Sequence, residues 1–167
     1  WRQVTEAVHA KGGKIYLQLW HMGRLSHPLY QPDGGAPLAP SPVAAAGKVL
    51  LPDFSRTEMP TPRAMSTAEV AGLAARYAHA ARCALDAGFD GVEIHGANGY
   101  LLEQFLQTRT NQRTDAYGGS IENRCRVVLE ITDAITEVWG AERVGIRLSP
   151  FGIANDSGEE DPMPLYS

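Results

Sequence analysis

The sequence has few of the features that mark a membrane protein or a nucleic-acid binder. It contains no apolar run of the length that a transmembrane helix needs. Its basic residues form no run and its formal net charge is −4, which argues against nucleic acid and anionic membranes as partners. We therefore expect a cytoplasmic protein with no membrane or nucleic-acid partner.

Cysteine is also scarce. The two cysteines, Cys83 and Cys125, lie far apart, and each falls inside a helical pattern. Two isolated thiols predict neither a disulfide framework nor a metal site. His21 and His27 are spaced too irregularly for a metal site, with no carboxylate at matching spacing. We expect no bound metal, and we expect both cysteines to be small buried residues in a reducing compartment.

The length and the ends of the chain bear on its domain organisation. A chain of 167 residues suits one domain, and an apolar content of 44% is enough for a hydrophobic core. The chain opens with Trp1 directly inside a helical pattern and stops abruptly at "PLYS". We interpret residues 1–167 as the internal segment of a single domain that is incomplete at both ends.

Short segments rich in β-branched residues alternate with helical patterns. Residues 14–20, 91–95 and 143–149 are the predicted strands, and each follows a helix that ends in glycine. This α-β-α-β-α-β alternation predicts an α/β fold with a parallel sheet and helices outside it.

Caps and apolar periodicity mark the predicted helices. Ser66 and Glu69 form a capping box, and Gly88 ends that helix. A later helix begins near Ser120 and ends at Gly140. The predicted apolar faces are Val4, Ala7 and Val8 in the first helix, Val70, Leu73, Tyr77, Ala81 and Leu85 in the second, and Ile121, Val128, Ile131, Ile135 and Val138 in the third.

A long segment without periodicity separates the first strand from the second helix. Residues 25–65 hold eight of the eleven prolines. A loop of this length is usually functional or disordered. Within it, "APLAPSPVAAAG" (36–47) is interpreted as an extended crossing of the surface, and other parts of the segment could pair as a small hairpin.

The two faces of each predicted strand differ. Side chains alternate between faces, and in every strand one face is apolar while the other carries polar groups near the C-terminal end. The residues on this second face are Gln18, Trp20, Glu93, His95 and Arg147. Active sites lie at that end of α/β barrels and of open α/β sheets. A closed barrel fits better, because helices cover both faces of an open sheet and both would then be apolar.

Each of these residues also has a structural explanation. His95 could be a hydrogen-bonded structural residue, Arg147 could pair with Glu93, and Trp20 could be a plain core residue. Their placement on one face and at one end favours a functional site.

Four segments carry a family resemblance. They are "QLWHMGRLSHP" (18–28), "GVEIHGANGYLLEQFLQ" (91–107), "TNQRTDAYGGSIENRCRVVLEI" (110–131) and "VGIRLSPFG" (144–152). Together they resemble the old yellow enzyme family of flavin-dependent ene-reductases, in the classical branch near the oxophytodienoate and N-ethylmaleimide reductases. The segments follow the family's order with similar spacing over nearly the whole chain.

The resemblance implies a fold and a cofactor. The fold is part of a (β/α)8 TIM barrel, about strands three to five with their helices, which holds FMN at its C-terminal mouth. NADPH or NADH reduces the FMN, and hydride then passes to the β-carbon of an α,β-unsaturated carbonyl or nitro compound. The loops that bind the FMN phosphate lie outside this chain. Within it, "AYGGS" (116–120) is interpreted as a turn into Ser120 as a helix N-cap.

The resemblance also implies catalytic roles. His95 and Asn98 match the pair of hydrogen-bond donors that binds the substrate oxygen, where negative charge develops. Tyr100 matches the proton donor to the α-carbon. Taken alone, Tyr100 could be a core tyrosine at a helix start, but within the family motif the catalytic role is favoured.

Three further roles follow from the same resemblance. Gln18 matches a contact to the flavin pyrimidine, where an amide can both donate and accept. Arg147 matches the residue near flavin N1 and O2. Trp20 forms part of the substrate pocket wall.

Other polar residues are interpreted as structural. Asp115, Glu122, Asn123 and Arg124 lie at a loop-to-helix junction, where capping and ion pairing brace the loop. Arg24, with His21 and His27, is interpreted in the same way.

Two alternatives to the ene-reductase remain open. One is a truncated barrel fragment that neither binds flavin nor catalyses a reaction, because three strands cannot close a barrel and open edges invite aggregation. The other is a barrel enzyme that binds a phosphorylated ligand without flavin. The combination of Gln18, His95, Asn98, Tyr100 and Arg147 argues against this second alternative.

Overall fold

Parallel strands form the central sheet in the computed structural model, which describes residues 1–167. The strands are β1 (Tyr16–Leu19), β6 (Gly91–Gly96) and β7 (Val144–Leu148), in the order β1-β6-β7. All pairs are parallel, with Gln18 opposite Glu93 and His95 opposite Arg147. The predicted strands and the shared polar face are confirmed, and Trp20 lies just beyond the end of β1.

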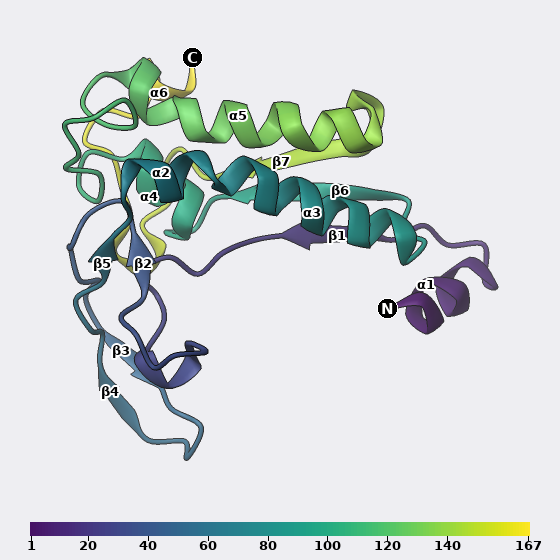
Figure 1. Cartoon of the computed structure of the whole chain (residues 1–167), viewed down its shortest axis with the longest axis horizontal. Coiled ribbons are helices and arrows are strands. Elements are labelled where there is room, and N and C mark those ends of the chain that lie inside the picture. The colour runs from purple at the N-terminus through teal and green to yellow at the C-terminus, as the bar shows by residue number, and fades with distance from the viewer.

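Two long helices cover the apolar face of this sheet. They are α3 (Leu73–Asp86) and α5 (Ile121–Trp139), which lie side by side over the strands (Figure 1). The indole Nε1 of Trp139 donates to the Ala81 carbonyl 3.0 Å away and joins the two helices. Fully buried side chains fill the layer between helices and sheet, namely Val92, Ile94, Leu73, Ala81, Val127, Ile131 and Ile135.

The helix signals hold with local differences. The capping box is present, with Ser66 accepting from the Glu69 amide, but Gly72 divides the predicted helix into α2 (Thr67–Ala71) and α3. Leu85 is 41% exposed, so its placement on the apolar face was wrong. Leu85 lines a hollow between α3 and α5, beside Ala134 and Val138, that is open to solvent.

The first helix, α1 (Arg2–His9), also differs from the prediction. Val4 is exposed, and Thr5 is the residue of this helix that is buried. The Thr5 hydroxyl donates to the Ala87 carbonyl at 2.6 Å, which docks α1 on the turn after α3. The predicted apolar face of Val4, Ala7 and Val8 is therefore not its contact face.

The cysteines are not both buried as expected. Cys83 is exposed on α3, and Cys125 is half-buried on α5. Both stay unpaired thiols within helices, as the sequence predicted. The correction concerns Cys83, which lies on the solvent side of its helix.

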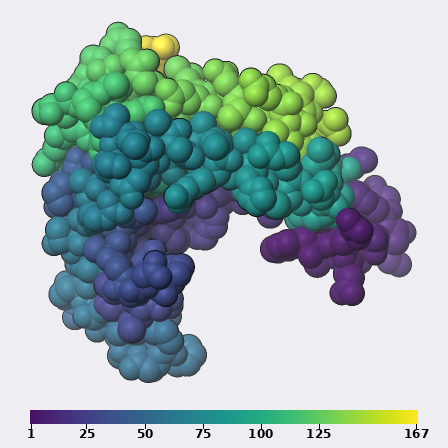
Figure 2. All heavy atoms as spheres, viewed as in Figure 1, coloured from purple at the N-terminus to yellow at the C-terminus, as the bar shows by residue number.

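The proline-rich segment forms its own small elements. They are η1 (Pro28–Tyr30), β2 (Leu38–Ala39) parallel to β5 (Arg63–Ala64), and β3 (Lys48–Leu50) antiparallel to β4 (Arg56–Glu58). The β3–β4 pair confirms the hairpin, which extends away from the sheet (Figure 1). The space-filling view shows an arch with the hairpin and α1 at opposite ends (Figure 2). The surface crossing was only partly right, because Pro42, Ala44 and Ala46 are exposed whereas Ala39, Pro40 and Ser41 are buried.

Short elements complete the chain. They are α4 (Leu101–Leu106), η2 (Ala141–Arg143), η3 (Ala154–Asp156) and α6 (Met163–Tyr166). No helix combines the length and the apolar character that crossing a bilayer requires.

The loop-to-helix junction before α5 is structural, as predicted. Arg113 pairs with Asp115 at 2.5 Å, and Ser120 accepts from the Asn123 amide as the N-cap of α5. Arg124, which is buried, donates to the Leu106 carbonyl and pairs with Glu159 at 3.2 Å. These bonds fix the loop between α4 and α5.

Candidate active site

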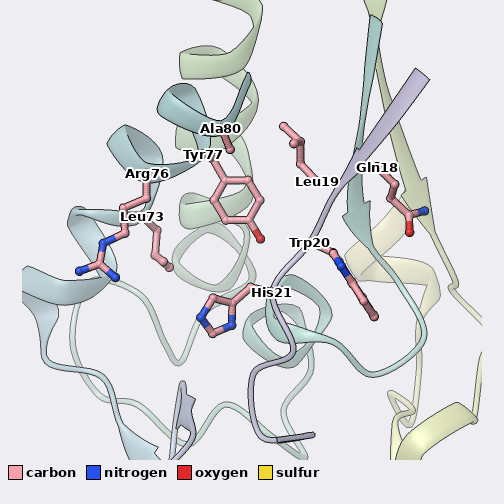
Figure 3. A pocket seen from close by; sticks show the side chains of 8 residues that line it. All are labelled: Gln18, Leu19, Trp20, His21, Leu73, Arg76, Tyr77 and Ala80. Atoms are coloured by element: carbon pink, nitrogen blue, oxygen red, sulfur yellow. The ribbon is translucent and has the colours of Figure 1, made fainter. Parts of the chain in front are cut away.

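Polar side chains converge where the parallel strands end. Gln18 and Trp20 extend from the side of β1 that faces away from α3, whereas Leu19 points toward Tyr77 on that helix (Figure 3). The Gln18 amide donates to the Glu93 carboxylate at 2.5 Å on the neighbouring strand. Strand parity therefore gathers the predicted residues on one open face.

An aromatic cluster forms at this face. The ring centroids of Trp20 and Tyr100 are 4.7 Å apart, those of His95 and Tyr100 5.1 Å, and those of Trp20 and His95 6.0 Å. His95 is the last inward-facing side chain of β6, and Tyr100 is the N-cap residue of α4. The strand, the turn and the helix start thus bring both groups against one indole.

His95 is buried and incompletely hydrogen-bonded. Only 3% of the residue is exposed, and Nδ1 is buried without a partner. Burial lowers the pKa of His95, and the nearby Arg147 lowers it further, while Glu93 acts in the opposite direction. The neutral imidazole so favoured keeps one N–H donor and one acceptor nitrogen.

Arg147 is a free cation at this face. It lies opposite His95 in the strand register and forms no ion pair. The suggested pairing of Arg147 with Glu93 was wrong, because Glu93 accepts from Gln18 instead. The guanidinium remains available to a ligand.

Asn98 lies in an unusual turn between His95 and Tyr100. Its φ is 57° and that of Gly99 is 80°, so two successive residues adopt the left-handed conformation, which asparagine and glycine tolerate best. The Asn98 side-chain amide makes no hydrogen bond within the chain. It is therefore free to donate outward.

Side chains that the sequence analysis did not single out hold this turn. Glu103, Gln104, Ser149 and Asn155 bond to the backbone of Asn98 and Gly99. The sequence signal for Glu103 and Gln104 was "LLEQFL", in which two polar residues interrupt a short apolar run. All residues of this helix, α4, are buried. Ser149 and Asn155 lie in segments far from Asn98 in the sequence, so no local sequence pattern indicated their bonds to it.

Two hollows border the site. One, of about 450 Å³, extends from Tyr100 toward the β3–β4 hairpin, and its lining includes Met22, Leu25, Tyr30, Lys48, Val49 and Met59. The other, of about 280 Å³, lies between the end of β1 and α3 and is lined by Leu19, Leu73, Tyr77 and neighbouring residues (Figure 3). The first adjoins the aromatic cluster and has a mostly apolar wall.

A sequence model described as the NADH:flavin oxidoreductase / NADH oxidase family matches residues 1–162. The chain belongs to this family. The resemblance to the old yellow enzymes is confirmed, and membership favours an enzyme segment over an unrelated barrel.

Curated members of the family are similar over the full chain. The chain is 47% identical over 99% of its length to 12-oxophytodienoate reductase 7 of Oryza sativa subsp. japonica, covering 42% of that protein. It is 54% identical over 98% of its length to flavin oxidoreductase hxnT of Emericella nidulans, covering 41%. It is 51% identical to a probable flavin mononucleotide-dependent alkene reductase of Leishmania infantum, covering 46%. The chain therefore spans less than half the length of these relatives.

Solved structures of the family share the fold. Morphinone reductase superposes with a TM-score of 0.93 at 52% identity, over 99% of this chain and 46% of that one. Morphinone reductase in complex with tetrahydroNAD gives a TM-score of 0.91 at 53% identity, over 99% of this chain and 47% of that one. The fold is accordingly part of a (β/α)8 TIM barrel, as predicted.

The polar face suits the flavin of this family. Arg147 is unpaired, and the Gln18 carbonyl oxygen accepts no hydrogen bond within the chain. Gly145, on the same face of β7, has no atom within 4 Å of the position that a Cβ would take. An open surface with a free cation and a free amide oxygen fits a planar ring with a polar, electron-rich edge.

Proposed function

We propose that this chain carries the catalytic centre of an FMN-dependent ene-reductase that NADPH or NADH reduces. The substrate is an α,β-unsaturated carbonyl or nitro compound. The observation that carries the proposal is the gathering of His95, Asn98 and Tyr100 at the end of β6, beside the open face of Gln18 and Arg147. The names of the relatives, among them an alkene reductase and a 12-oxophytodienoate reductase, support the same reaction class.

Gln18 and Arg147 would hold the flavin. The Gln18 amide would pair with the alternating donors and acceptors of the pyrimidine edge, and Arg147 would place a positive charge beside it. FMN, when bound, supplies the hydride chemistry. The protein supplies the binding, the orientation and the electrostatics.

His95 and Asn98 would bind the substrate oxygen. Negative charge grows on that oxygen during reduction, and each aimed donor is worth roughly 3 kcal/mol in comparable sites. The lowered pKa of His95 favours the neutral ring, which donates one N–H. The Asn98 amide has no competing bond within the chain.

Tyr100 would deliver the proton to the α-carbon. A phenol can protonate a carbanion-like carbon without ionising beforehand. The rings of Trp20 and His95 fix its position from two sides. The hollow of about 450 Å³ beside Tyr100 would take the part of the substrate away from the double bond, with Trp20 as a wall.

The decisive experiment measures the two half-reactions separately in the full-length protein that contains this chain. Bound FMN is quantified first by its absorbance. Anaerobic mixing with NADPH or NADH follows flavin reduction, and mixing the reduced protein with cyclohexenone follows reoxidation. Tyr100→Phe should slow reoxidation about 100-fold or more and leave flavin reduction within a factor of about two.

A matched control is Tyr117→Phe, because Tyr117 bonds to Glu130 away from the site. It should leave both half-reactions close to the parent. Equal loss of both half-reactions in Tyr100→Phe would refute the proton-donor role. A full-length protein without FMN would instead support the alternative of a non-catalytic barrel.

A further inference from the structure

The turn at Asn98 and Gly99 is bonded at every backbone polar atom. The Asn98 N–H donates to the Ser149 hydroxyl at 2.9 Å, and the Gly99 N–H donates to the Glu103 carboxylate at 2.5 Å. The Asn98 carbonyl accepts from the Asn155 amide at 2.8 Å. The Gly99 carbonyl accepts from the Gln104 amide at 2.7 Å. Side chains, rather than a regular backbone ladder, satisfy this peptide segment.

These side chains also bond to one another and to a third loop. The Ser149 hydroxyl donates to the second Glu103 oxygen at 2.5 Å, so one carboxylate supports both N–H bonds of the turn. The guanidinium of Arg24 donates to the carbonyls of Asn155 and Asp156. Arg24 is 2% exposed and also donates to the carbonyls of Val43 and Ala44.

Burial makes this arrangement rigid. Glu103 is fully buried, and Gln104 is nearly so. A buried polar group that loses its partner retains its full desolvation penalty, so the bonds that Glu103 and Gln104 make to Gly99 are costly to break, whereas the Ser149 bond is part-buried and the Asn155 bond is exposed. The fit is also steric, because a Cβ at Gly99 would lie 2.8 Å from the Ala154 carbonyl oxygen.

We propose that Ser149, Glu103, Gln104 and Asn155 are positioning residues that fix the Asn98–Gly99 turn, and thereby the point at which the Asn98 amide meets the substrate oxygen. The inference rests on the proposed function of Asn98 for its catalytic consequence, but the holding of the turn is independent of it. The four side chains come from α4, from the loop that follows β7 and from η3. Segments that follow β6 and β7 therefore determine together where the side-chain amide of Asn98 points.

The test compares Ser149→Ala with Ser149→Thr in the full-length, FMN-loaded protein. The alanine removes the acceptor for the Asn98 N–H, and the threonine keeps a hydroxyl. The probe is phenol, whose binding is followed through the flavin absorbance. Ser149→Ala should weaken phenol binding about five-fold to ten-fold with unchanged flavin content, and Ser149→Thr should stay near the parent.

A double-mutant cycle identifies the route of the effect. In an Asn98→Ala background, Ser149→Ala should cause no further loss of phenol affinity, because the group that it positions is already gone. An additive loss would overturn the proposal, and so would an unchanged affinity in Ser149→Ala when Asn98→Ala alone weakens binding.

Hydrogen exchange separates this inference from the proposed function. Exchange at the amides of Asn98 and Gly99 should be faster in Ser149→Ala than in Ser149→Thr, whatever Asn98 does for the substrate. If Asn98→Ala leaves phenol affinity unchanged, the donor role fails, and the exchange result alone decides the positioning role. Equal exchange in the two Ser149 variants would overturn it.

Discussion

Trp20 and Tyr100 meet edge to face, with ring centroids 4.7 Å apart and an angle of 70° between the ring planes. Trp20 follows the end of β1, whereas Tyr100 is the N-cap residue of α4, beyond the end of β6. About half of Trp20 is exposed, so its indole packs against the phenol and also borders solvent. The proposed proton donor therefore packs against a residue that follows a different strand.

Replacing Trp20 should loosen the position of the Tyr100 ring. Trp20→Ala removes an aromatic contact worth about 1 kcal/mol, so we expect reoxidation of the reduced flavin by cyclohexenone to slow about five-fold. Trp20→Phe keeps an aromatic edge and should retain most of the rate. Single-turnover mixing measures both. A rate in Trp20→Ala equal to that of Trp20→Phe would show that the indole does not orient Tyr100.

Removing the two donors should abolish recognition of the substrate oxygen. Phenolates resemble the enolate that these donors are proposed to stabilise, so His95→Ala combined with Asn98→Ala should weaken phenol binding by about 100-fold or more. Spectral titration of the FMN-loaded protein measures the affinity. The variant Thr61→Ala, at an exposed hydroxyl without hydrogen bonds, is the control. Unchanged affinity in the double variant would disprove the donor-pair assignment.

The protonation of His95 gives a pH-dependent prediction. Its pKa is lowered, first by burial and then by Arg147, so its NMR titration midpoint should lie below the ordinary value of 6.5. In Arg147→Gln the midpoint should move upward. A histidine with a lowered pKa contributes stability above about pH 6.5, and that contribution is lost as the pH falls toward its pKa in the folded protein. A midpoint that is unaffected by Arg147→Gln would contradict the stated cause.

Glycine at position 99 should be required for steric reasons beyond its backbone conformation. Gly99 and Gly119 have φ values of 80° and 83°, but a Cβ at Gly119 meets no atom within 4 Å, whereas one at Gly99 meets the Ala154 carbonyl oxygen at 2.8 Å. Gly119→Ala should cost about 1 kcal/mol of unfolding free energy for the left-handed backbone alone. Gly99→Ala should cost clearly more and should also weaken phenol binding. Denaturant titration of both variants measures the difference, and equal losses would argue against the steric requirement.

The sequence predicts those parts of the fold that depend on local patterns. The alternation of faces in β1 and β6 puts Gln18 and Glu93 on the same face, and the caps at Ser66 and Ser120 follow from their own neighbours. Leu85 shows the limit, because helical spacing does not tell how closely the neighbouring helix packs against each residue of the apolar face. Cys83 is exposed for a different reason, because it lies on the solvent side of α3.

The candidate site also has a part that the sequence predicts and a part that it does not. His95, Asn98 and Tyr100 lie within one short segment, so their association is visible in the sequence. The bond from Asn98 to Ser149 joins residues from separate strand ends and exists only after the sheet has formed. Glu93 bonds to Gln18 and not to Arg147. This partner likewise depends on side-chain geometry that the spacing of the residues does not specify.

The buried guanidinium of Arg24 has a consequence for exchanging parts between relatives. It binds carbonyls from the 43–44 loop and from residues 155–156, while Asn155 in turn bonds to Asn98. A chimera could take its proline-rich segment from one homologue and the loop after β7, with residues 155–156, from another. The carbonyls that Arg24 binds would then come from two different parents. The practical unit of recombination is therefore the set of interlocked loops, and a crossover placed outside that set is the one that preserves the site.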